Sequence, residues 1–156
     1  MTGRIEKRLE ELGVALPAAA APAGNYVPAV RTGNLVFVSG QIPFGADGKL
    51  VHNGVLGRDV TIEQGQEAAK VCAINILAQI KALTGDLDRI ARIVKITGFV
   101  HAESGFDAEP KVINGTSDFF GEVFGEAGRH ARAAVGVASL PLGVSVEVEA
   151  IVEISD

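Results

Sequence analysis

The spacing of apolar residues along this chain changes from a helical to a strand period, and these changes predict its elements. Near the N-terminus Ile5, Leu9 and Leu12 recur at intervals of four and three residues, which predicts a short amphipathic helix over residues 4–12. Residues 17–24 are rich in Ala and Pro and have no such period. They are therefore predicted to form an extended connector rather than a second helix.

Two longer helices are predicted in the middle of the chain. The first spans residues 61–83 and carries one apolar stripe, and its Thr61 and Gln64 have the spacing of a capping box. The second is expected to be capped by Ser104 or Asp107 and to bury a face of valine, isoleucine and phenylalanine residues. Two helices of this length can cover one face of a sheet.

Runs rich in β-branched and aromatic residues predict the strands. Two short strands around a Gly–Asn turn cover residues 30–31 and 35–38, and a central strand covers residues 93–100. The last segment, residues 132–154, is interpreted as a hairpin whose strands are joined by residues 140–143. The order ββαβαββ predicts one α+β domain with both long helices on one face of its sheet.

The predicted hairpin contains the most informative charges. In its second strand, alternation places Glu147 and Glu149 on one face and the valines on the other. Arg132 precedes a very apolar run, and a buried cation without a partner would be costly. From the residues alone, Arg132 could pair with one of these glutamates or bind a substrate carboxylate, and both possibilities stay open.

Composition and charge exclude several classes of protein. The 156 residues suit one domain, and the net charge of −5 argues against a broad nucleic-acid-binding surface. Cys72 is the only cysteine, so no internal disulfide can form, and its place in an apolar stripe predicts a buried, unreactive thiol. The charged N-terminus has no signal-peptide core, and no apolar run could span a membrane, so a cytoplasmic protein is expected.

Motifs for metals and cofactors are absent from the sequence. His52, His101 and His130 are far apart, and none has a second ligand at metal-binding spacing, so no metal site is expected. The chain also lacks a phosphate-binding loop, a dinucleotide-binding fingerprint and a nucleophile elbow. Chemistry without a metal or cofactor is therefore the simplest prediction.

Three ordered motifs give the sequence a specific resemblance. They are GNLVFVSGQIP at residues 33–43, VKITGFV at residues 94–100, and RAAVGVASLP at residues 132–141 followed by VEVEA at residues 146–150. In this order and spacing they resemble the Rid family, also known as the YjgF or L-PSP endoribonuclease family. Within the single domain 1–156, the family core corresponds to residues 24–156, and residues 1–23 form an N-terminal extension.

The resemblance implies a chorismate-mutase-like subunit and a homotrimer, in which three sheets form a central barrel and clefts open between neighbouring subunits. It implies cofactor-free hydrolysis of reactive 2-imino or 2-enamino acids to 2-keto acids and ammonia. Two alternatives stay open: a non-enzymatic binder of small carboxylates or regulator, and an endoribonuclease. The negative net charge argues against the last, because single-strand binding usually needs a basic groove.

The resemblance also implies roles for individual residues. Arg132 matches the arginine that binds the substrate carboxylate, and Glu147 matches the glutamate that positions water near the imine carbon. Ala134 stands where the family often has a cysteine, so a thiol is excluded there and only its backbone could join the site. The other matched positions line the cleft and are Tyr26, Ser39, Gly40 and Asn114.

Overall fold

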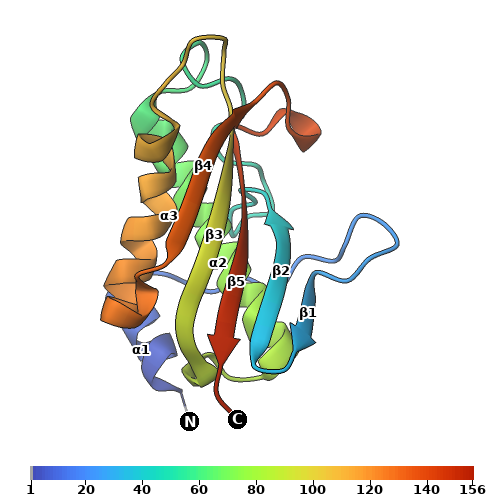
Figure 1. Cartoon of the computed structure of the whole chain (residues 1–156), viewed down its shortest axis with the longest axis vertical. Coiled ribbons are helices and arrows are strands. Elements are labelled where there is room, and N and C mark those ends of the chain that lie inside the picture. Colours follow the sequence, from blue (N-terminus) through green and yellow to red (C-terminus); the bar gives the residue numbers. More distant parts are fainter. Residues whose placement is uncertain (1) are drawn as a thin grey trace.

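The computed structural model describes residues 2–156 and contains one five-stranded sheet with two long helices on one of its faces (Figure 1). This arrangement confirms the predicted α+β class and the order of the core elements. None of the helices in the described chain is long and apolar enough to cross a membrane. The elements are α1 (Arg4–Glu11), β1 (Ala29–Thr32), β2 (Leu35–Gln41), α2 (Ile62–Thr84), β3 (Ile90–His101), α3 (Glu109–Phe124), β4 (Ala131–Val137) and β5 (Val146–Ile154).

Local hydrogen bonds define both ends of α2. The Thr61 hydroxyl accepts from the Gln64 backbone N–H at 3.1 Å, and the Gln64 side chain accepts from the Thr61 N–H at 3.0 Å. These two bonds confirm the predicted capping box, and they satisfy N–H groups that the first helical turn cannot pair. At the other end, Gly85 adopts a positive φ of 77°, which few residues other than glycine tolerate.

The start of α3 differs from the prediction. Neither Ser104 nor Asp107 caps this helix, because Ala108 occupies the cap position and no side chain accepts a hydrogen bond there. Pro110 lies in the first turn, where its fixed φ and missing N–H are tolerated, and this sets the point at which the helix begins. Both predicted caps therefore lie outside the helix, and that prediction is wrong.

The strand order β1-β2-β5-β3-β4 shows that the predicted C-terminal hairpin is wrong. β4 pairs in parallel with β3, whereas β5 pairs antiparallel with both β2 and β3, so β3 separates β4 from β5 (Figure 1). The reason is that α3 connects β3 to β4 and returns the chain to the same end of the sheet, which requires parallel pairing. Residues 138–145 then carry the chain past β3 to its other edge.

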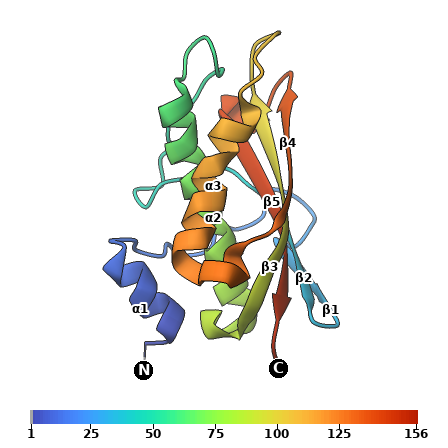
Figure 2. The same ribbon diagram turned by 60° about the vertical axis from the view of Figure 1, so that its left-hand side comes forward.

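The two faces of the sheet have different environments. The even-numbered residues of β5, from Val146 to Ile154, are buried against the helices, as the alternation predicts. The opposite face, here called the open face, has no helix over it (Figure 2). It exposes the side chains of Phe37 and Val135. Ser145, which directly precedes β5, is fully buried, and its hydroxyl has no hydrogen-bond partner among the described residues.

The N-terminal segment is fixed to the body at several points. The Asp88 carboxylate accepts hydrogen bonds from the backbone N–H groups of Arg4 and Ile5, both at 2.7 Å, and so caps α1. Figure 2 shows α1 beside the lower parts of α2 and α3, on the side away from the sheet. After α1 the chain is extended through the Ala/Pro connector, as predicted, and passes over α2 toward β1.

Candidate functional site

Arg132 lies on the edge strand β4 and points toward the helix side of the sheet. Its pairing partner on β3 is Ile96, which is fully buried against the helices, and directly paired residues point to the same face. The Arg132 Nη1 group donates to the Asn114 Oδ1 at 2.8 Å and to the Ser117 Oγ at 3.2 Å, both on α3. No other atom of this guanidinium has a hydrogen bond within residues 2–156, and the side chain is exposed.

Ser117 is a member of this group that no sequence pattern indicated. It is three residues after Asn114, and side chains at this spacing lie on the same face of a helix. Ala134 is the next residue of β4 that faces the helices, because it pairs with Gly98, whose Cα lies against Ile113 of α3. The structure therefore brings together three of the predicted residues, Arg132, Asn114 and Ala134, and adds a hydroxyl.

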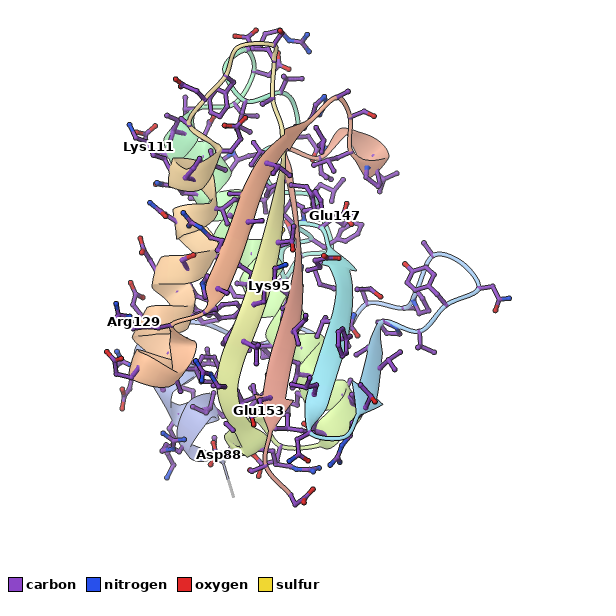
Figure 3. All side chains as sticks on the ribbon, viewed as in Figure 1. Asp88, Lys95, Lys111, Arg129, Glu147 and Glu153 are labelled. Carbon is purple, nitrogen blue, oxygen red and sulfur yellow. The ribbon has the colours of Figure 1, made fainter. Side chains whose placement is uncertain are left out.

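Glu147 occupies a different environment on the open face of the sheet. Figure 3 shows it on the upper part of β5, next to the end of β2, with Lys95 and Glu153 lower on the same face. Burial raises the pKa of this carboxyl above its ordinary value, and the negative charge of Glu149 raises it further. A carboxyl with a raised pKa can gain and lose a proton nearer to neutral pH than an exposed one.

Gly40 gives the Glu147 carboxylate the space that it occupies. A Cβ placed on Gly40 would overlap one oxygen of this carboxylate, so a larger residue here would force the Glu147 side chain to move. The register of β2 against β5 shifts between Val38 and Gln41, and this irregularity brings the backbone of Gly40 beside Glu147. Gly40 therefore lets the Glu147 carboxylate keep its place beside the end of β2.

A cavity of about 500 Å³ opens beside Glu147 and is also lined by Gly40 and Tyr26. The Tyr26 ring is half exposed, and its hydroxyl accepts a hydrogen bond from the backbone N–H of Ala23 at 3.4 Å. The volume lies within the range of about 300–1,000 Å³ that is usual for small-molecule sites. Three of the predicted site residues thus share one cavity.

Arg132 and Glu147 cannot act on one substrate within a single subunit, because they lie on opposite faces of the sheet. Arg132 pairs with Ile96 on the helix side, whereas Glu147 pairs with Phe99, three residues further along β3. Side chains an odd number of residues apart on a strand point to opposite faces. The possibility that Arg132 pairs with Glu147 or Glu149 is therefore excluded within one subunit, since Glu149 also lies on the open face.

Ser39 directly precedes Gly40 on β2 but does not line the cavity beside Glu147. Its hydroxyl donates to the Val27 carbonyl at 3.2 Å, and its side chain lines a hollow of about 420 Å³ on the open face with Lys95 and Glu149. Cys72 is fully buried, as predicted, and burial raises its pKa well above the ordinary thiol value. Among the described residues, no three His, Cys, Asp or Glu side chains are placed so that they could hold a metal ion.

Similarity to known proteins extends over nearly the whole chain. Residues 6–154 match the model of the family described as "YjgF/chorismate mutase-like, putative endoribonuclease". Protein TCP17 of Trypanosoma cruzi is 48% identical over 156 residues, which are 99% of this chain and 97% of TCP17. The crystal structure of Atu1372 from Agrobacterium tumefaciens, whose function is unknown, is 54% identical, with a TM-score of 0.89, over 97% of this chain and 92% of that chain.

An enzyme is also among the relatives. A 2-iminobutanoate/2-iminopropanoate deaminase of Salmonella typhimurium is 37% identical over 139 residues, which are 88% of this chain and 94% of the deaminase. The family match begins at residue 6, so it includes the connector that forms one wall of the cavity beside Glu147. The similarity is therefore not confined to the strands that carry Arg132 and Glu147.

Proposed function

Since this chain belongs to the YjgF/chorismate-mutase-like family, we propose that it hydrolyses reactive 2-imino acids and their 2-enamino tautomers to 2-keto acids and ammonia. Water adds to C2 of the imine, and the tetrahedral adduct then loses ammonia as the carbonyl forms. The reaction consumes one water molecule and involves no net oxidation or reduction. A relative with 37% identity is named as a 2-iminobutanoate/2-iminopropanoate deaminase, which supports this reaction class.

In this proposal Arg132 binds the carboxylate of the substrate. Asn114 and Ser117 hold one arm of its guanidinium, and this fixes the direction in which the remaining N–H groups point. A planar guanidinium can hold a carboxylate through two parallel hydrogen bonds, and such charge-assisted bonds contribute about 1.5–3 kcal/mol each. The substrate is thereby oriented before water attacks, which removes part of the entropic barrier.

Glu147 positions the water and accepts its proton. The pKa of its carboxyl is raised by burial and by Glu149, so the ionised form is a stronger base than an exposed glutamate. The same carboxyl, once protonated, can return the proton to the departing amine. Its place in a cavity beside Gly40 leaves room for a substrate next to the carboxylate.

The complete site is proposed to form between two subunits of a homotrimer. The observation that carries this proposal is that Arg132 and Glu147 lie on opposite faces of one sheet, although both are assigned to one substrate. A second subunit, with its Arg132 edge beside the first subunit's cavity, would bring them together. The exposed apolar side chains of the open face, including Phe37 and Val135, favour an assembly that covers this face.

The proposal is tested by following the decay of 2-iminopropanoate, generated from alanine by an amino-acid oxidase. We expect the wild type to accelerate this decay and Arg132→Ala to lose roughly a thousandfold in kcat/KM, since two charge-assisted hydrogen bonds are removed. Arg132→Lys should keep a small part of the activity, because an ammonium cannot replace the two-armed contact. Arg129→Ala is the matched control, since Arg129 is exposed and pairs only with Glu126.

Two results would contradict the proposal. Equal rates for the wild type and Arg132→Ala would remove Arg132 from the reaction. Saturable binding of 2-keto acids with no turnover of any 2-imino acid would instead identify a non-enzymatic binder. RNA cleavage that is lost in Arg132→Ala, without any imine hydrolysis by the wild type, would favour the endoribonuclease alternative.

A further inference from the structure

We propose that the cavity beside Glu147 is a side-chain pocket that selects 2-imino acids with branched aliphatic or aromatic side chains, with residues 20–23 of the connector as its selective wall. This inference rests on the proposed function and adds the substrate class. 2-Iminopropanoate and 2-iminobutanoate carry only a methyl or an ethyl group, whereas the cavity measures about 500 Å³. Most of that volume would remain empty around so small a side chain.

The walls of the cavity have the chemistry of an apolar binding site. The connector contributes Ala21, Pro22 and Ala23, the segment after β2 contributes Ile42 and Phe44, and the turn before β5 contributes Leu142. Alanine and proline side chains present a smooth apolar surface and lose no rotamer entropy when a ligand covers them. Small-molecule pockets typically combine such walls with a few polar groups.

The amide N–H donors of the side chains that line the cavity are already bonded within the protein. The Asn75 Nδ2 group donates to the backbone carbonyls of Ile42 and Phe44, both at 3.0 Å. Both of its N–H groups are therefore used within the protein and are not available to a ligand. Among the residues that line the cavity, Glu147 alone carries a charge. A substrate whose side chain carries a carboxylate would therefore lose hydration without gaining an amide donor, which is unfavourable.

Gln79 holds the connector in the position where it lines the cavity. Its side chain is almost fully buried on α2 and donates from Nε2 to the Ala20 carbonyl at 2.9 Å. The same amide nitrogen lies 3.4 Å from the Gln41 side-chain oxygen, so two buried amides act together. Because burial makes an unpaired amide costly, Gln79 strongly favours the connector position that closes this cavity.

The expected preference follows from the burial of additional methylene groups. Each methylene that moves from water into an apolar pocket improves kcat/KM by roughly fourfold. The imine derived from leucine should therefore be hydrolysed with a kcat/KM at least about tenfold higher than that derived from alanine. The imine derived from glutamate should be a poor substrate, because Glu147 repels its second carboxylate.

Ala21→Phe tests the wall directly. Its phenyl ring would occupy the cavity, so the ratio of kcat/KM for the leucine-derived to the alanine-derived imine should fall by at least about tenfold. The matched control is Ala18→Phe, which makes the same change on the same exposed connector at a position that does not line this cavity. This control should leave the ratio unchanged.

Gln79→Leu tests the anchor of the wall. Without the hydrogen bond to the Ala20 carbonyl, the connector should shift and the selectivity ratio should fall. Gln66→Leu is its matched control, because the Gln66 side chain also lies on α2 and also donates to a backbone carbonyl, that of Lys111, but away from the cavity. It should keep the wild-type ratio.

The outcomes separate this inference from the proposed function. The pocket proposal would be overturned if the alanine-derived imine were hydrolysed as well as imines with longer apolar side chains. It would also be overturned if Ala21→Phe changed kcat/KM equally for every substrate. Either result would leave the proposed function intact. If no imine is hydrolysed at all, calorimetric titration with pyruvate and 4-methyl-2-oxopentanoate still tests the pocket. Equal affinity for these two 2-keto acids, or none for either, would then overturn it.

Discussion

The edge of β4 around Arg132 and the cavity around Glu147 differ in how the surroundings act on the charged side chain. Arg132 is exposed to water, and two neutral side chains of α3 fix only its direction. Glu147 is half buried, and its surroundings raise its pKa. An arginine stays charged in either environment, so it can bind a carboxylate at an exposed edge, whereas a glutamate needs burial to become a useful base.

This difference explains why the two groups need not belong to the same subunit. Each group owes its property to its own chain: side chains of α3 direct Arg132, whereas burial and Glu149 raise the pKa of Glu147. The structure separates them by the thickness of the sheet, and each group keeps its own environment. If a second subunit completes the site, the substrate carboxylate lies at the arginine and its imine carbon lies at the glutamate.

The largest expected effect comes from mixing two variants, each of which lacks one of these two groups. The mixture tests whether Arg132 and Glu147 of one site belong to different subunits. As homotrimers, Arg132→Ala and Glu147→Gln should each lose roughly a hundredfold or more in activity, but co-refolded mixtures should recover activity. Some shared sites then receive Arg132 from one variant and Glu147 from the other, and random assembly gives about a quarter of the wild-type number of sites. The measurement is the rate of 2-iminopropanoate decay at equal total protein.

The control is a double variant carrying both substitutions in one chain, mixed with wild type, to confirm that subunits exchange. Mixtures of the single variants that remain inactive although exchange occurs would place both residues of each site in one subunit. A monomeric mass by light scattering for the active wild-type protein would have the same consequence.

The second prediction concerns the pH dependence of Glu147. Its carboxyl must be ionised to accept a proton, so kcat/KM should fall as the pH drops through its raised pKa. Glu147→Gln should lower kcat roughly a hundredfold and remove this acid limb. Glu149→Gln removes a negative charge that favours the protonated form, so the limb should move to lower pH in that variant.

Glu153→Gln is the matched control, because Glu153 lies on the same face of β5 but is not among the groups that raise the pKa of Glu147. Its pH profile should coincide with that of the wild type. An acid limb that persists in Glu147→Gln would assign the titration to another group.

The raised pKa of Glu147 also affects folding stability. The free energy of unfolding should fall as the pH rises through this pKa, because the folded protein holds the proton more tightly than the unfolded chain does. Glu147→Gln should therefore be slightly more stable than the wild type at neutral pH.

Much of the fold could be predicted because its signals are local. The capping box of Thr61 and Gln64 and the two-residue alternation of β5 each depend on residues that are neighbours in the sequence, and both are confirmed. The pairing of strands is not local in this sense. A hairpin between β4 and β5 satisfied every local signal, but β3 competes for both strands and pairs with each of them.

The same limit applies to the candidate site. Sequence and family resemblance named Arg132 and Glu147, but their separation onto opposite faces follows from their register against β3, which no local pattern encodes. The role of Gly40 was partly predictable, since a strand-terminal glycine permits close approach. Gln79 was not predictable, because it was one polar residue on a long helix, and only the path of the connector makes its amide important.

The third and smallest prediction concerns Ser117, which holds Arg132 without contacting the proposed substrate. Ser117→Ala removes one hydrogen bond of 3.2 Å to the Arg132 Nη1 and should raise KM roughly fivefold with kcat nearly unchanged, since such a bond contributes about 1 kcal/mol. In an Arg132→Lys background the same substitution should have no further effect, which distinguishes positioning of the guanidinium from a structural role. Ser104→Ala, at an exposed loop serine, should leave both constants unchanged. A fall in kcat with constant KM in Ser117→Ala would show that this hydroxyl acts on the chemical step and not on the direction of Arg132.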